Sequence, residues 1–182
     1  MTDTIPETPK SPSGRRWLWI AGAVLAGLLA FNLSVWLPVA NQLGDDTRNE
    51  GIGIHVRRTA WVHPTSLTID LTEPGSASTA DLLRMLFQSA EVLKDRSFSR
   101  VILARGGQAV FVLSGDDFQD IGQAYAWGQN PLYLTRTLPE KLETPDGRPA
   151  FGSWTGGWLG VMSGQMEDVN ELGSRWVQGR SS

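Results

Sequence analysis

The 182-residue chain contains no cysteine and only two histidines. Without cysteine the chain has no disulfide, no thiolate nucleophile and no cysteine-ligated zinc site. His55 and His63 are separated by about 26 Å if they lie on one strand, which is too far to share a metal ion. We therefore expect no metal centre built on these residue types.

Basic residues are not in excess, and no phosphate-binding loop is present. Lys and Arg number 16 against 19 Asp and Glu, which gives a formal net charge of -3. A nucleic-acid-binding domain presents a basic face, so this balance predicts no nucleic-acid partner. Gly152, Gly156, Gly157 and Gly160 precede no Gly-Lys-Ser/Thr and follow no strand, so we expect no nucleotide cofactor and no other cofactor.

The longest apolar run extends from Trp17 to Ala40 and holds no charged residue. A helix rises about 1.5 Å per residue and the hydrocarbon core of a bilayer is about 30 Å thick, so about 20 apolar residues cross it. Trp17 and Trp36 would lie about 28 Å apart, one at each headgroup level. The run predicts a single transmembrane helix over 17–40 in contact with the bilayer, after a disordered tail over 1–16.

The flanking charges predict the orientation of this helix. Lys10, Arg15 and Arg16 precede the run, whereas mainly acidic residues follow it. Positive flanks stay in the cytoplasm, so we expect a cytoplasmic N-terminus and an extracytoplasmic domain, which in a bacterium means the inner membrane and the periplasm. A cleaved signal peptide is an alternative, although the run is longer than such segments and Pro38–Ala40 is a poor cleavage site. A twin-arginine export signal at Arg15 and Arg16 is a weaker one.

Small residues recur every four positions within the run, at Gly22, Ala26 and Ala30. Such a stripe lets two membrane helices approach closely. These three residues are therefore our candidates for self-association in the membrane.

The rest of the chain predicts one α+β domain over 54–137, joined to the membrane helix by a linker over 41–53. Ser78 and Asp81 form a capping-box pattern at the start of a helix. Gly106 and Gly107 separate two apolar runs, as in a tight β-hairpin. The expected strands cover 54–62, 67–72, 101–104, 109–113 and 132–135, and the expected helices cover 79–94 and 116–127.

From residue 66 to 135 the predicted order is strand, helix, strand, strand, helix, strand. This is the split βαβ order of ferredoxin-like folds, here with an extra N-terminal strand over 54–62. Both helices would then cover one face of an antiparallel sheet. The remainder, 138–182, predicts a polar loop, a Gly/Trp-rich segment and a C-terminal amphipathic helix from Met162 to Trp176.

Acidic residues supply the strongest candidates for catalysis, namely Asp70, Asp116 and Asp117. The last two lie at the start of a predicted helix, where a carboxylate serves as a cap or as a partner of the helix dipole. No histidine is near them in sequence to act as a base. A hydrolase is thus the least favoured of three hypotheses, and we expect that the protein is not an enzyme.

The favoured hypothesis is a membrane-anchored, non-catalytic module that binds a protein partner or a second copy of itself. The alternative is a domain that binds a small ligand or glycan on a platform formed by Phe151, Trp154 and Trp158. Both hypotheses compete with simple packing of the same aromatic and methionine side chains. The candidate interaction residues are Phe151, Trp154, Trp158, Met162, Met166 and Trp176.

Overall fold

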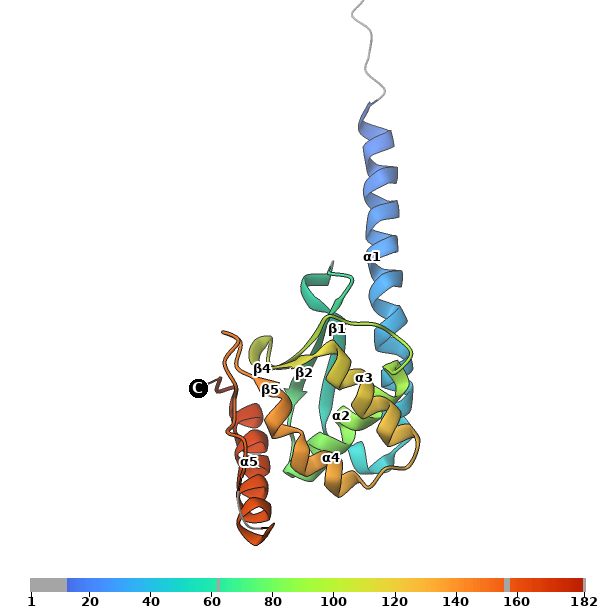
Figure 1. Ribbon diagram of the computed structural model, residues 1–182. Coiled ribbons are helices and arrows are strands. Elements are labelled where there is room, and N and C mark those ends of the chain that lie inside the picture. Colours follow the sequence, from blue (N-terminus) through green and yellow to red (C-terminus); the bar gives the residue numbers. More distant parts are fainter. Residues whose placement is uncertain (1–12, 62, 156–157, 182) are drawn as a thin grey trace, which may run out of the picture.

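The computed structural model describes residues 13–61, 63–155 and 158–181. A five-stranded mixed sheet packs against helices, and one long N-terminal helix projects from this body (Figure 1). The predicted α+β class is confirmed. The elements are α1 (Ser13–Gly44), β1 (Gly53–Arg58), β2 (Ser66–Glu73), α2 (Thr79–Leu93), β3 (Arg100–Arg105), β4 (Gln108–Ser114), α3 (Gly115–Ala126), α4 (Pro131–Thr137), β5 (Leu142–Glu143) and α5 (Trp158–Gln178), with short 3₁₀ turns at Thr47–Asn49, Thr59–Trp61 and Pro139–Lys141.

The strands lie in the sheet in their sequence order, β1-β2-β3-β4-β5. β2 and β3 are parallel neighbours joined by α2, and every other pair is antiparallel. A split βαβ unit would place another strand between β2 and β3, so the predicted ferredoxin-like order is not confirmed. The apolar run of β3 instead pairs directly with β2, as in Leu67 with Val101 and Ile69 with Leu103.

The segment expected as the last strand, 132–135, belongs to helix α4. The Asn130 side chain caps this helix by accepting a hydrogen bond from the Leu132 N–H, and Pro131 occupies the first turn. Proline is favourable there because its missing N–H has no partner in a helix anyway. Asn-Pro also favours turns, and for this reason the sequence predicts a strand after a turn where the structure has a helix. The fifth strand of the sheet is β5, which lies in the segment expected as a polar loop.

Two local predictions are confirmed in atomic detail. The Ser78 N–H donates to the Asp81 carboxylate at 3.0 Å, while the Asp81 N–H donates to the Ser78 hydroxyl at 3.2 Å. The turn between β3 and β4 places Gly106 and Gly107 at φ of 55° and 84°. These positive values are readily available to glycine, so both glycines permit the hairpin.

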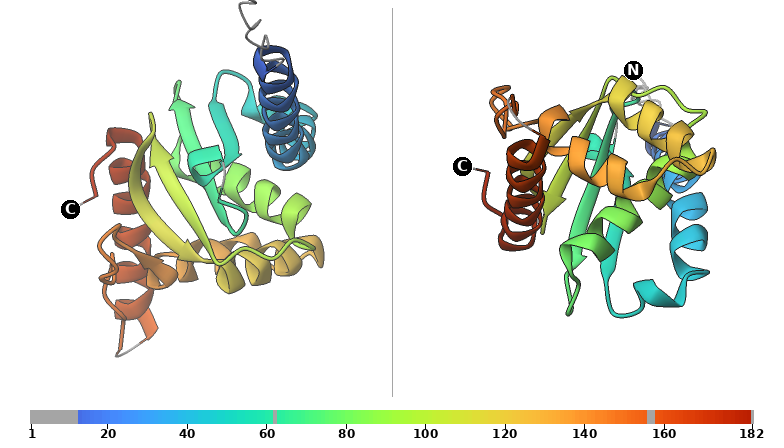
Figure 2. Two further views of the ribbon diagram at one scale, coloured as in Figure 1. Left: turned by 90° about the horizontal axis from the view of Figure 1, so that it is seen from above. Right: turned by 60° about the horizontal axis from the view of Figure 1, so that its bottom comes forward.

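Helices cover one face of the sheet, as the two views in Figure 2 show for α2, α3 and α4. Residues that pair across β2, β3 and β4 share this face, and they form the centre of the core. α2 and α3 also pack closely against each other, with Gly122 of α3 lying against the Ala90 backbone. The fully buried residues on this face of the sheet are Leu67, Ile69, Leu71, Val101, Leu103, Phe111 and Leu113.

The N-terminal helix α1 is longer than predicted and takes part in the domain. It continues past Ala40 to Gly44, and its second half packs against β1 and α2. The residues that follow do not form a free linker, because the Asn49 side chain donates to both Leu43 O and Gln88 Oε1 at 3.0 Å. The prediction of a linker over 41–53 is therefore wrong. The buried stripe of α1 consists of Asn32, Val35, Val39 and Leu43.

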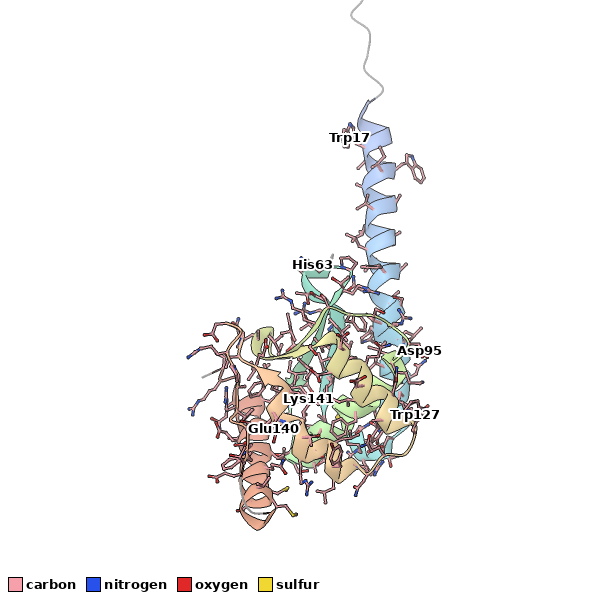
Figure 3. All side chains as sticks on the ribbon, viewed as in Figure 1. Trp17, His63, Asp95, Trp127, Glu140 and Lys141 are labelled. Atoms are coloured by element: carbon pink, nitrogen blue, oxygen red, sulfur yellow. The ribbon has the colours of Figure 1, made fainter. Side chains whose placement is uncertain are left out.

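The first half of α1 extends beyond the domain and exposes apolar side chains on all sides (Figure 3). This helix is long and apolar enough to cross a membrane, which is compatible with a transmembrane anchor or with a signal sequence. β1, at the edge of the sheet, is shorter than the predicted strand over 54–62. It ends at Arg58, and Ala60 in the following turn has a positive φ of 51°.

Candidate interaction site

A groove with a volume of about 470 Å³ lies between α2, α4 and α5. These elements meet at the end of the domain opposite to the projecting half of α1 (Figure 1). The first turns of α2, which follow the Ser78 cap, line one side of the groove. α4, which begins at Pro131 after the Asn130 cap, lines another side. Most of the lining is apolar, and it includes Phe87, Tyr125, Leu132, Met166 and Val169.

Large apolar side chains are exposed on the groove lining and on the stretch of chain from the end of α3 into α4. Trp127, which caps the C-terminus of α3, is 83% exposed, and Leu132 and Tyr133 of α4 are about half exposed. In the sequence, Trp127 lies between Tyr125 and Pro131, which both line the groove. We call Trp127, Leu132, Tyr133 and Met166 the distal rim. Leu132 and Met166 line the groove itself, whereas Tyr133 lines a separate, smaller pocket beside α3 and α4. Exposed large apolar side chains on and near a groove are typical of surfaces that bind another molecule.

The charged residues of the groove neutralise one another. Arg48 lies 2.7 Å from the Asp46 carboxylate, and Arg84 lies 2.8 Å from Asp81 and 3.7 Å from Asp46. The hydrogen bond from Arg48 holds the pKa of the Asp46 carboxyl well below its usual range. Each arginine therefore has a carboxylate beside it. The groove suits an apolar segment of a partner better than a free anion.

The structure places the predicted interaction residues of the C-terminal helix in three different environments. Met166 is exposed and lines the groove, whereas Met162, one turn earlier, is partly buried. Trp176 is fully buried, and its Nε1 donates to Ala104 O at 2.8 Å. Trp176 is thus a core residue that fixes α5 to β3, and it is not available to a partner.

The aromatic residues of the Gly/Trp-rich segment do not share one surface as far as the described residues show. Phe151 is partly buried against Phe111, with ring centroids 5.7 Å apart. Trp154 is 40% exposed, and its Nε1 donates to the Asp168 carboxylate at 2.5 Å. The Trp158 side chain, like Gly156 and Gly157, lies outside the described residues.

The three candidate aspartates are not gathered in one site. Asp70 accepts a hydrogen bond from the Gly107 N–H and pairs with Ala104 near the end of β3. Asp117 is held by the Ser114 hydroxyl and Lys141 at the start of α3, next to the opposite end of β3. Asp116 is exposed beside it. Within the described residues, no three His, Asp or Glu side chains are placed to hold a metal ion.

Sequence reasoning missed most of the distal rim. The sequence predicts the end of a helix at Trp127 and a short strand that contains Leu132. The available signal was a tryptophan directly before Gly128, followed within a few residues by further large apolar side chains. The stripe of Gly22, Ala26 and Ala30 lies on the exposed first part of α1 and has no contact with the domain.

Comparison with family models, with curated proteins and with solved structures finds no match for this chain.

Proposed function

We propose that this protein is a single-pass membrane-anchored interaction module that carries out no catalysis. The apolar part of α1 from Trp17 to about Ser34 crosses the bilayer, and the distal rim and its groove bind an apolar segment of a protein partner. The observation that carries the proposal is the exposure of Leu132 and Met166 on the lining of an apolar groove, with Trp127 and Tyr133 exposed on the adjoining stretch from the end of α3 to α4. This surface lies at the end of the domain that faces away from the membrane half of α1.

The orientation follows the flanking charges. Lys10, Arg15 and Arg16 keep the N-terminus in the cytoplasm, so the domain is extracytoplasmic, in the periplasm of a bacterial cell. In this arrangement the distal rim points into the aqueous compartment, away from the lipid. A partner can then reach the groove without entering the bilayer.

The chemistry of the groove defines the kind of partner. Its apolar lining offers a hydrophobic contact, which contributes roughly 25 cal/mol per Å² of apolar surface removed from water. Its arginines are already paired with carboxylates, so charge adds little affinity for a simple anion. An amphipathic helix or an extended apolar segment of another protein fits these properties.

Site-specific photo-crosslinking in cells tests the proposal. A photoreactive amino acid at Leu132 of the full chain should give a discrete crosslinked product in the membrane fraction. The same amino acid at Asp95, which is exposed on another surface, serves as the matched control. Trp127→Ala should reduce the Leu132 product several-fold. The absence of any product from Leu132, including one with a second copy of the chain, would contradict the proposal.

A second candidate function is the binding of a glycan or small ligand at Trp154. Its indole packs over Gly164 and is hydrogen bonded to Asp168, while 40% of the residue stays exposed. A fixed ring with an open face is suited to stacking on a sugar. Titration with soluble glycans should then change tryptophan fluorescence in the wild type and in Trp127→Ala, but not in Trp154→Ala. An equal change in both variants would exclude this site.

A further inference from the structure

Three arginines surround α1 at the level where it leaves the domain. Arg57 and Arg58 lie at the end of β1, and Arg96 lies in the α2–β3 connection. His63, in the β1–β2 connection, marks the same end of the domain beside α1 in Figure 3. We call Arg57, Arg58 and Arg96 the arginine collar.

Two members of the collar are attached to one flank of α1. The Arg58 guanidinium lies 4.0 Å from the centre of the Phe31 ring. The backbone N–H of Arg58 donates to Asn32 Oδ1 at 3.0 Å. Arg96 donates to the Ser34 hydroxyl at 3.3 Å. These contacts hold both guanidinium groups beside a single turn of the helix, where the buried stripe of α1 begins.

The positive charge of this pair is not neutralised by the protein. Among the described residues, no carboxylate lies within 4 Å of Arg58 or Arg96. The Nε of Arg58 is buried and makes no hydrogen bond within the described part of the chain. Burial, together with the neighbouring charge of Arg96, lowers the pKa of Arg58. An anion beside these groups would relieve the repulsion between the two guanidinium groups.

The other flank of α1 carries an apolar groove of about 230 Å³ with Arg57 on its lining. Leu29, Leu33 and Trp36 of α1 form one side, and β1 forms the other. The positive charge of Arg57 is neutralised less than in a close ion pair, because the carboxylate of Asp70 is 4.0 Å away. Apolar walls next to a cation match an amphiphile that has a hydrocarbon tail and an anionic head.

The length of α1 places the collar at the membrane surface. From Trp17 to Ser34 the helix rises about 26 Å, and the hydrocarbon core is about 30 Å thick. The domain therefore cannot stand away from the bilayer if Trp17 lies at the far interface. Ser34 then lies close to the polar boundary of the near leaflet, within reach of that boundary for the long side chains of the collar.

We propose that the arginine collar binds the phosphate groups of anionic phospholipids in the leaflet on the domain side of the membrane. This inference depends on the proposed membrane anchoring of α1. The phospholipids neutralise the arginines from outside the protein and seat the domain on the bilayer in one orientation. The long arginine side chains allow the guanidinium groups to reach the headgroup layer.

Lipid selectivity of the full chain tests the proposal. The protein is reconstituted in phosphatidylcholine vesicles in which a third of the lipid is phosphatidylglycerol, with trace spin-labelled lipid of either kind. The wild type should enrich phosphatidylglycerol over phosphatidylcholine at its surface several-fold, since each arginine near an anionic surface adds about fivefold. The double substitution Arg57→Gln and Arg96→Gln should remove most of this preference. Arg148→Gln, an exposed arginine outside the collar, is the matched control and should retain it.

Flotation of the same vesicles separates the two proposals. A chain that floats with the vesicles but shows no phosphatidylglycerol preference overturns the collar proposal and leaves the anchor intact. A chain that stays in the aqueous fraction overturns both. Equal selectivity in the wild type and the double variant also overturns the collar proposal. Arg58 is not substituted, because its backbone and ring contacts support the fold, and a thermal unfolding midpoint equal to that of the wild type confirms that the double variant is folded.

Discussion

The two halves of α1 belong to one helix but have different surroundings. Residues 17–31 expose their apolar side chains, as in Trp17 at 70% and Leu25 at 59%. Residues 32–43 bury one stripe, in which Val35 is 0% and Val39 is 1% exposed, against β1 and α2. One uninterrupted apolar sequence thus serves two environments. Hydropathy therefore measures how strongly a segment prefers to leave water, and it does not show whether lipid or protein covers that segment.

An acidic substitution in each half gives the largest expected contrast. Val35→Asp places an unpaired charge in the core and should destabilise the domain by at least about 3–5 kcal/mol, which is a large part of the stability of a typical domain. Val24→Asp lies in the projecting half and should leave the unfolding midpoint of the domain unchanged in detergent. Thermal unfolding of both full-length variants, followed by near-ultraviolet circular dichroism, measures the difference. Equal effects would show that the halves are not distinct.

A polar residue at the boundary between the halves should give the next largest effect. Asn32 accepts a hydrogen bond from the backbone N–H of Arg58, so Asn32→Leu removes the acceptor from that partly buried donor. We expect a loss of about 1–3 kcal/mol in unfolding free energy. Asn41→Leu, on the exposed side of the same helix, is the control and should change it by less than about 0.5 kcal/mol. Urea unfolding in detergent distinguishes the two variants, and a neutral Asn32→Leu would place the boundary elsewhere.

The segment after α1 should make stability depend on pH. Asp46 accepts hydrogen bonds from Arg48 and Gln88, and its folded-state pKa lies below the value of about 3.9 in an unfolded chain. Its contribution is therefore present in full above about pH 5 and is lost as the pH falls through the folded-state pKa. Asp46→Asn should be less stable than the wild type at neutral pH and approach it at acid pH. A difference between the two that stays constant with pH would contradict this assignment.

The smallest effect is expected for the side of α1 that faces away from the domain. Leu37→Ser changes a side chain that is 49% exposed and should alter the unfolding free energy in detergent by no more than about 0.5 kcal/mol. The neighbouring Val39→Ser, which empties part of the buried stripe, should cost several times more. Urea unfolding of the two variants measures how far the unfolding free energy differs between the two sides of α1 within one turn. A large loss from Leu37→Ser would mean that a further surface covers this side.

Local patterns in the sequence were sufficient for several elements of the fold. The Ser78 and Asp81 capping box and the Gly106–Gly107 hairpin both depend on residues close in sequence, so their geometry follows from short-range chemistry. α4 was missed because Asn130 and Pro131 favour a turn and a helix start equally well. The strand order was missed because pairing between distant strands depends on tertiary packing, which no single segment encodes.

The candidate site was predicted only in part for a similar reason. Met166 and Trp176 occur at helical spacing on the same amphipathic helix, yet one is exposed in the groove and the other is buried beneath β3. Periodicity identifies a helix with an apolar stripe, but it does not show how far the stripe is covered. Leu132 reaches the groove because the segment after the Asn130–Pro131 turn is the helix α4, whereas the sequence predicts a strand over 132–135.

The central claim is that both halves of α1 form one rigid helix in a bilayer, and a distance measurement tests it directly. Because the chain has no cysteine, spin labels can be attached at Gly27→Cys and Asp95→Cys alone, and both positions are exposed. In lipid vesicles, electron spin resonance should give a single narrow distance distribution between the labels, since α1 continues from lipid into the domain core. A broad distribution, as a flexible linker after the membrane segment would produce, would contradict it.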